Sequence, residues 1–339
     1  MSGSSLDGLD LALCIFKSEF DFELVKQASI PYSKNWEKRL ASSTNLSHTD
    51  LCLLESAYTE YTSEIIVDFL KGETVDYVSS HGHTLLHSPE GKYSYQLSTG
   101  SYMSAHIGIP VISDFRTQDI AKGGQGAPIA PVVEKYLFSG YDSYLNLGGI
   151  CNCSFHTENT ITAYDIGPCN QLLNALAQLE GKAYDHNGEM ARMGKCIPSL
   201  FHSAVTHPYY TLDSPKSLDN QYVQQEFVKQ FLAFDAPIHD KLRTAVDLIV
   251  HITVAGYSSD ISSVFATGGG ALNQFLISEL NNSLSSIGVD LVIPNKDIIE
   301  FKEAILMALM GYLRIHKKVN VFSSVTGATS DTISGCIYL

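Results

Sequence analysis

The chain has 339 residues, of which 45% are hydrophobic and 17% charged, and this composition excludes a disordered or fibrous protein and favours two globular domains. A formal net charge of −14 argues against a nucleic-acid-binding or anionic-membrane surface, because both need clustered Lys and Arg. The seven cysteines are scattered and include no C-x-x-C pair, which is typical of a reduced cytoplasm. No apolar stretch has the length of a membrane span or the pattern of a signal peptide. We therefore expect a soluble cytoplasmic protein.

Strand-like and helix-like patterns alternate in the first part of the chain. Two β-rich segments, "LDLALCIF" and "FELVKQASIPYS", are separated by a short break and are expected to pair as neighbours. Apolar residues at helical spacing predict a helix from about residue 47 to 71. Strands are expected at 75–81, 109–115 and 144–150, each running into a polar or glycine-rich turn.

The second part continues the alternation. A strand-like "ITAYDIGP" is followed by a helix over 240–257, a strand over 262–270 that ends in three glycines, the helix "NQFLISELNNSL", the strand "VDLVIP" and a final helix "FKEAILMALMGYLRIHK". The pattern predicts an α/β protein with parallel or mixed sheets, in which ligands bind at the carboxyl ends of strands. Glycines and prolines cluster in "GGQGAPIAP", so the expected lobes are 1–130 and 131–339.

Three glycine-containing turns, at 3–10, 145–152 and 266–274, follow or join strand-like segments. Each leaves backbone N–H groups uncovered by side chains, which suits the approach of phosphate oxygens. The simpler interpretation is that each glycine only provides a φ > 0 position in a turn. Neither G-x-x-x-x-G-K-[ST] nor G-x-G-x-x-G is present, so a P-loop or a dinucleotide-binding fold lacks its fingerprint.

The order of these turns resembles the ATPase superfamily of actin, sugar kinases and heat-shock chaperones. A finer resemblance, over nearly the whole chain, is to the anhydro-N-acetylmuramic acid kinase family. Its motifs are matched in order by "MSGSSLDGLD", "SSHGHT", "DFRTQDIAKGGQGAP", "LNLGGICN", "YDIGPCN", "YD…ARMGK", "PKSLDNQYV", "TGGGALN", "KEAILMALM" and "SVTGA". The resemblance implies a two-lobed actin-like ATPase fold with ATP and sugar in a cleft between the lobes, a last segment that packs back on the first lobe, and a homodimer.

The reaction that this resemblance implies opens the 1,6-anhydro bridge of anhydro-N-acetylmuramic acid with water and phosphorylates O6. The products are N-acetylmuramic acid 6-phosphate and ADP, in peptidoglycan recycling. Asp165 in "YDIGP" is the expected base that takes a proton from the attacking water. The alternative role for Asp165 is to cap a turn before Gly167 and Pro168.

The resemblance also assigns ATP contacts to the three turns. The expected ATP-binding residues are Gly3, Ser4, Ser5, Asp7, Gly8, Asn146, Gly148, Gly149, Gly268, Gly269 and Gly270. Because few cations lie near these turns, Mg²⁺ is the expected partner of the phosphates, with Asp7 rather than Asp10 reaching it through water. Asn273 is expected to cap the helix that follows the third turn.

The expected sugar-binding residues are His81, His83, Arg116, Asp119 and Glu303. A guanidinium holds a carboxylate with two hydrogen bonds, so Arg116 would pair with the lactyl carboxylate; the alternative is an ion pair with Asp114 or Asp119. The histidines suit sugar hydroxyls, since a metal site that included His87 would lack a fourth ligand at recognisable spacing. Glu303 is expected to begin a helix, where the dipole favours an acid.

Members of the family generally carry a short β-strand ahead of the first turn, and this sequence begins at the turn itself. Without such a strand, "LDLALCIF" would be unpaired on one side and the first turn would be held less firmly. Three other functions stay open: a kinase for another small sugar or carboxylate, a non-catalytic sugar- or nucleotide-binding protein, and an actin-like filament.

Overall fold

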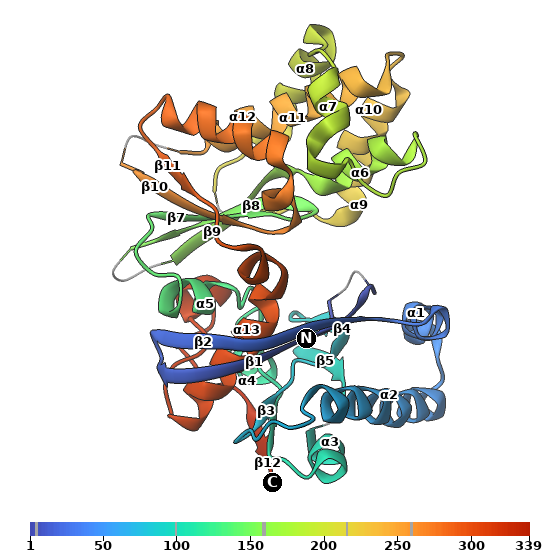
Figure 1. Ribbon diagram of the computed structural model, residues 1–339, viewed down its shortest axis with the longest axis vertical. Coiled ribbons are helices and arrows are strands. Elements are labelled where there is room, and N and C mark those ends of the chain that lie inside the picture. The colour runs from blue at the N-terminus through green and yellow to red at the C-terminus, as the bar shows by residue number, and fades with distance from the viewer. Residues whose placement is uncertain (4–5, 99, 158–160, 215, 258–259) are drawn as a thin grey trace. The chain divides into compact units, whose positions relative to one another are not determined.

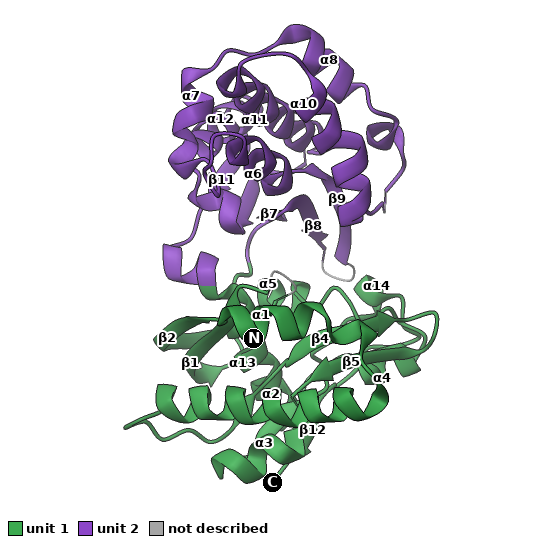
Figure 2. Ribbon diagram, turned by 90° about the vertical axis from the view of Figure 1, so that its right-hand side faces the viewer, with its two compact units in different colours: residues 1–139, 301–339 green, residues 140–300 purple. Residues whose placement is uncertain are grey.

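The computed structural model describes residues 1–3, 6–98, 100–157, 161–214, 216–257 and 260–339. These residues form two compact units, one made of residues 1–139 and 301–339 and the other of residues 140–300 (Figure 2). None of the described helices has the length and apolar character needed to cross a membrane. The two units are defined by which residues pack together. The expected lobes, 1–130 and 131–339, divide the chain by its ligand-binding motifs and stay a prediction.

The first unit begins with a long antiparallel pair of strands, β1 (Gly8–Ser18) and β2 (Asp21–Pro31) (Figure 1). Their expected pairing is confirmed. A second sheet has the order β12 (Cys336–Tyr338), β6 (Val111–Ser113) and β3 (Val78–Ser79). A hairpin of β4 (His83–Ser88) and β5 (Tyr93–Leu97) was not expected from the sequence, because the polar residues within it hide the alternation.

The helices of the first unit include the long helix expected near 47–71, which is confirmed as α2 (His48–Phe69). The Ser47 side chain caps it by accepting a 3.2 Å hydrogen bond from the N–H of Asp50. The shorter helices are α1 (Lys34–Ala41), η1 (Ser43–Asn45), α3 (Gly100–Ile107), α4 (Thr117–Ala121), α5 (Pro131–Tyr136) and α14 (Ser323–Thr326). Apolar side chains from α1, α2 and β5, among them Trp36, Tyr58 and Leu97, form a buried core.

The second unit is built on one mixed sheet with the order β11 (Asp290–Val292), β10 (Ser263–Thr267), β7 (Ser143–Leu147), β8 (Ile150–His156) and β9 (Ile161–Pro168). Strand β10 runs parallel to both of its neighbours, while β7, β8 and β9 form an antiparallel meander. The α/β class predicted from the alternation is therefore confirmed.

Helices cover one face of this sheet and supply most of the core of the second unit (Figure 1). They are α6 (Asn170–Gln178), η2 (His186–Gly188), α7 (Glu189–Met193), α8 (Pro198–Val205), η3 (Pro208–Thr211), α9 (Asn220–Tyr222), η4 (Val223–Val228), α10 (Lys229–Ala233), α11 (Ile238–Ala255), η5 (Gly269–Leu272) and α12 (Gln274–Ser285). Leu147 of the sheet packs in one fully buried cluster with Leu172, Val246 and Leu276 of these helices.

The last long helix, α13 (Lys296–Ile315), starts earlier than the sequence pattern indicated. The Asn295 side chain accepts a 2.9 Å hydrogen bond from the N–H of Ile298, which satisfies a donor of the first turn. Glu303 therefore lies inside the helix and not at its start, so the expected contact of Glu303 with the helix dipole is wrong.

Candidate functional site

The second and third glycine turns lie side by side in the second unit. Strands β7 and β10 are parallel neighbours with Asn146 opposite Thr267, so the turns that follow them leave the same edge of the sheet. Gly268 has φ +85°, and an added Cβ would lie 2.7 Å from Oδ1 of Asn146 and 2.8 Å from the carbonyl oxygen of Leu147. Both the backbone conformation and this close approach require glycine at 268.

Asn170, the first residue of α6, holds the second turn. Its side-chain amide donates a 2.9 Å hydrogen bond to the carbonyl oxygen of Leu147, and its backbone N–H donates to the carbonyl oxygen of Gly148. Gly149 and Gly269 are exposed, so their backbone groups are open to a ligand. The edge can therefore offer uncovered backbone groups to an anion, as expected for phosphate or adenosine contacts.

Asn273 closes the third turn as predicted. Its side chain accepts a 3.1 Å hydrogen bond from the N–H of Leu276 and caps α12.

Asp165 lies near the end of β9, next to the second turn. The backbone N–H of Leu218 donates a 2.8 Å hydrogen bond to Oδ2 of Asp165, and the hydroxyl of Tyr209 donates to the Asp165 carbonyl oxygen. Over the described ranges, Oδ1 of Asp165 has no hydrogen-bond partner. Burial raises the pKa of the Asp165 carboxyl, and the Leu218 N–H partly offsets this effect. The group is thus fixed by one oxygen and free to accept a proton at the other.

The first turn belongs to the other unit. Gly8 opens β1 at a point where an added Cβ would lie 2.5 Å from the carbonyl oxygen of Ile30, so glycine is needed for the close pairing with β2. Asp7 is exposed, and Gly3 is described without a regular secondary structure. Ser4 and Ser5 lie outside the described residues.

A buried chain of hydroxyls and a histidine holds the start of this turn. The Tyr32 hydroxyl donates a 2.7 Å hydrogen bond to Oγ of Ser2, which lies 2.9 Å from Nδ1 of His83. The Tyr58 hydroxyl lies 2.7 Å from that of Tyr32. His83 therefore uses one ring nitrogen within the protein.

Arg116 and His81 form the second polar cluster of the first unit. Nε of Arg116 donates a 2.9 Å hydrogen bond to Nε2 of His81, and Nη1 donates to the carbonyl oxygen of Gly126. Burial, followed by the charge of Arg116, lowers the pKa of His81 to about 3. His81 is therefore neutral, with Nε2 as the acceptor and Nδ1 facing the carbonyl oxygen of Gly82 at 3.2 Å.

The remaining donors of Arg116 are available to a ligand. Nη2 makes no hydrogen bond to a described residue, and Arg116 has no ion pair with Asp114 or Asp119. The alternative of an internal ion pair for Arg116 is therefore wrong in the described part of the chain. Burial lowers the pKa of Arg116, while the nearby carboxylate of Glu303 raises it. Glu303 is exposed, so Arg116 and Glu303 can both face a small polar ligand.

Asp119 differs from the other expected sugar-binding residues because it is fully buried. Its Oδ2 accepts a 2.8 Å hydrogen bond from the N–H of Gly126, and its Oδ1 accepts one of 2.7 Å from the hydroxyl of Thr326. Both oxygens thus hold the protein's own loops.

Comparison with known proteins places the chain in a family. The sequence profile described as "Anhydro-N-acetylmuramic acid kinase" matches residues 1–339. The chain belongs to this family. The family is one of ATP-dependent sugar kinases, so the protein is an enzyme of that class.

Individual relatives agree with the family profile. The chain is 32% identical over 361 residues to the anhydro-N-acetylmuramic acid kinase of Sulfurimonas denitrificans, covering 100% of this chain and 98% of the relative. It is 31% identical over 354 residues to that of Legionella pneumophila strain Lens, covering 100% and 96%. Among solved structures it is similar to an activator of 2-hydroxyisocaproyl-CoA dehydratase from Clostridium difficile with bound ADPNP, at 15% identity and a TM-score of 0.36, covering 56% of this chain and 66% of that one.

Several residues of this kinase's candidate site were missed at the level of sequence. The network of Ser2, Tyr32 and Tyr58 joins residues far apart in the chain, and no local pattern marks it. Asn170 and the N–H of Leu218 were also missed as partners of the site. A signal existed for both, because Asn170 is the last residue of "YDIGPCN" and Leu218 lies in "PKSLDNQYV", two family-like motifs in which neither residue had a stated role.

Proposed function

We propose that this kinase transfers the γ-phosphoryl group of ATP to O6 of 1,6-anhydro-N-acetylmuramic acid while water opens the 1,6-anhydro bridge. The products are N-acetylmuramic acid 6-phosphate and ADP, and the role is peptidoglycan recycling in the cytoplasm. The observation that carries this proposal is the Asp165 carboxylate: Oδ2 is fixed by the N–H of Leu218, Oδ1 has no hydrogen-bond partner among the described residues, and burial raises the pKa of the group. A base with these properties is what the attack of water requires.

The proposed reaction couples ring opening by water to phosphoryl transfer. Oδ1 of Asp165 takes a proton from water, and the water oxygen forms a bond to C1 of the sugar. The C1–O6 bond breaks, and O6 forms a bond to the γ-phosphorus as the bond to the β-γ bridging oxygen breaks. Positioning and charge neutralisation supply most of the catalysis of such a transfer.

The sugar would be held by groups of the first unit. Arg116 supports this role because its Nη2 donors face no described partner while its Nε is fixed by neutral His81. A guanidinium held in this way can bind the lactyl carboxylate with directed hydrogen bonds. We propose Glu303 and His83 as contacts of the sugar hydroxyls. His81 is proposed as a positioning residue for Arg116, and Asp119 as one for the loop at Gly126.

The nucleotide would be held by the three glycine turns, with the residues expected from the sequence: Gly3, Ser4, Ser5, Asp7 and Gly8; Asn146, Gly148 and Gly149; Gly268, Gly269 and Gly270. Because the chain has a formal net charge of −14, the phosphates of ATP also need Mg²⁺ to neutralise them. Among the described residues no group of three or more acidic, His or Cys side chains could hold a metal. The exposed Asp7 fits an ion that is bound mainly by phosphates and water.

The test is ADP release from ATP, Mg²⁺ and the anhydro sugar in ¹⁸O-labelled water, with mass analysis of the sugar product. We expect one ¹⁸O atom at C1 of each phosphorylated product. Asp165→Asn should lower kcat by about 10²- to 10⁴-fold, whereas Asp235→Asn, which changes an exposed carboxylate of the same unit, should not.

Two outcomes would contradict the proposal. Phosphorylation without ¹⁸O at C1 would indicate a kinase for an already open sugar or another small substrate. Binding of nucleotide without ADP release would indicate a non-catalytic member of the family.

A further inference from the structure

Asp165 lies at an irregularity of strand β9. Asn152 of β8 is paired with Asp165 and Cys151 with Gly167, so Ile166 is an extra residue without a partner on β8. The Ile166 side chain is buried in the core of the second unit. A β-bulge of this kind turns the local backbone and re-aims a neighbouring side chain, and it is frequent next to functional sites.

Three residues close together in the chain, Tyr209, Lys216 and Leu218, hold Asp165 at this bulge. The N–H of Asp165 donates a 2.9 Å hydrogen bond to the carbonyl oxygen of Lys216, and the Asp165 carbonyl oxygen accepts one of 2.6 Å from the Tyr209 hydroxyl. The N–H of Leu218 donates to Oδ2 of the side chain. Both backbone groups and one carboxylate oxygen of Asp165 are thus bound from outside the sheet.

The Lys216 side chain connects two of these contacts. Its ammonium group donates hydrogen bonds to the carbonyl oxygens of Tyr209 and Tyr210, at 3.2 and 3.5 Å. The same nitrogen lies 4.8 Å from the centre of the Tyr209 ring, which is the range of a cation–π contact. Lys216 therefore holds Tyr209 with its side chain and Asp165 with its carbonyl oxygen.

Tyr209 is itself held firmly. It is only 3% exposed, and its backbone N–H donates a 3.2 Å hydrogen bond to Nδ1 of His207. The centre of its ring lies 5.9 Å from that of Tyr210 and 6.5 Å from that of Tyr222. Among the described residues, its hydroxyl forms a hydrogen bond only to Asp165. A buried hydroxyl that lost this acceptor would lack a partner, which makes the contact costly to break.

The other titratable groups near Asp165 do not compete with Leu218 in setting its pKa. They are Tyr209 of η3 and Cys151 of β8. Burial raises the pKa of the Tyr209 hydroxyl above its ordinary value and that of the Cys151 thiol to about 12, so both groups are uncharged near neutral pH. The pKa of Asp165 therefore reports how firmly the Leu218 N–H holds Oδ2.

We propose that Tyr209 and Lys216 are positioning residues for Asp165, which keep its backbone at the bulge so that Oδ2 stays on the Leu218 N–H and Oδ1 stays open to water. Their role in catalysis rests on the proposed function, in which Asp165 is the base. Both side chains act through Asp165 and not on the substrates.

The test compares two variants with two matched controls in the full chain. Tyr209→Phe removes the hydroxyl and keeps the ring, and Lys216→Met removes the ammonium group and keeps most of the stem. Tyr210→Phe removes a neighbouring hydroxyl that is buried without a hydrogen-bond partner among the described residues, and Lys229→Met removes an exposed ammonium group of the same unit. The pKa of the Asp165 carboxyl is measured by NMR with ¹³C-labelled aspartate, and its signal is assigned by its loss in Asp165→Asn.

We expect Tyr209→Phe and Lys216→Met each to raise the pKa of Asp165 by roughly half a unit or more, because the Leu218 N–H then holds Oδ2 less firmly. In the ADP-release assay they should lower kcat by about 10- to 100-fold, since a misplaced base is a poor one. The KM values for ATP and the sugar should change little. The two controls should match the unaltered chain in both measurements.

A double variant tests the path of the effect. Because Tyr209 is proposed to act through the Leu218 contact, Tyr209→Phe combined with Leu218→Pro should raise the pKa of Asp165 no further than Leu218→Pro alone. Additive shifts would overturn this path.

Two other results would overturn the positioning roles. One is an Asp165 pKa in both variants that equals that of the controls, and the other is a raised KM with kcat unchanged, which would indicate residues that bind a substrate. Absence of ¹⁸O at C1 with the unaltered chain would instead contradict the proposed function, and the comparison of pKa values would still decide whether Tyr209 and Lys216 position Asp165.

Discussion

The backbone N–H of Leu218 holds Oδ2 of Asp165 at 2.8 Å, although the two residues are 53 positions apart in the chain. This contact keeps the pKa of Asp165 lower than burial alone would set it. Because the proposed base acts in its deprotonated form, activity is lost as the pH falls through this pKa. The acidic limb of kcat/KM should therefore lie above 3.8, the ordinary value of an aspartate.

Leu218→Pro removes the N–H donor and should move this acidic limb to higher pH. Loss of a hydrogen bond to a charged group is worth about 1.5–3 kcal/mol, which corresponds to roughly one to two pH units. Leu218→Ala keeps the N–H and should leave the limb in place. The measurement is kcat/KM for the sugar over about pH 4–9. Identical limbs in the proline and alanine variants would show that the contact does not tune the base.

Gly268→Ala should weaken both folding and ATP binding. Its φ of +85° is unfavourable for alanine, and the new Cβ would lie within 2.8 Å of the Leu147 carbonyl. We expect a loss of about 2–5 kcal/mol in the free energy of unfolding, measured in urea.

Gly288→Ala is the matched control, because Gly288 has φ +79° but nothing within 4 Å of an added Cβ. It should cost about 1–2 kcal/mol and leave the KM for ATP unchanged. Equal losses in the two variants would mean that the contact between the two turns contributes nothing beyond backbone strain.

Arg116→Gln should raise the KM for the sugar, since the guanidinium is proposed to hold its carboxylate. The loss of charge-assisted hydrogen bonds predicts a decrease of roughly 10- to 100-fold in kcat/KM for the sugar. The KM for ATP in the same variant is the internal control and should change little. Arg39→Gln, which removes a cation over the Trp36 ring, controls for charge. An equal rise in both KM values would place Arg116 outside the sugar site.

Ser2→Ala should destabilise the first unit, because it leaves the Tyr32 hydroxyl and Nδ1 of His83 short of a buried partner. We expect a loss of about 1–3 kcal/mol. The double variant with Tyr32→Phe should cost less than the sum of the two single changes, since both members of one hydrogen bond are then removed. Strict additivity in urea unfolding would indicate that the network does not act as a unit.

Features that depend on neighbouring residues could be predicted from the amino-acid sequence alone. Periodic apolar residues predicted α2 and the β1–β2 pair, and a single side chain predicted the cap at Asn273. The motif order also indicated the family that the profile later matched. These signals are local because helix periodicity, strand alternation and capping each act within a few residues.

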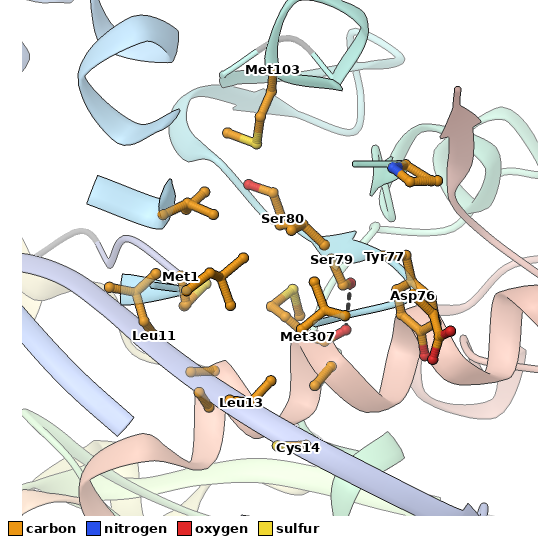
Figure 3. A pocket seen from close by; sticks show the side chains of 18 of the residues that line it. Met1, Leu11, Leu13, Cys14, Asp76, Tyr77, Ser79, Ser80, Met103 and Met307 are labelled. Carbon is orange, nitrogen blue, oxygen red and sulfur yellow. Dashed lines mark hydrogen bonds between the residues drawn. The ribbon is translucent and has the colours of Figure 1, made fainter. Parts of the chain in front are cut away.

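Contacts between distant segments became known only from the folded structure. It showed that Asp119 is buried against Thr326, that Arg116 pairs with His81, and that Leu218 fixes Asp165. It also revealed a cavity lined by β1 and by residues 74–80 around β3 (Figure 3). Such contacts depend on how sheets and helices pack, which no local pattern records. In the sequence, a carboxylate that binds a ligand also looks the same as one that holds a loop, as Asp119 does.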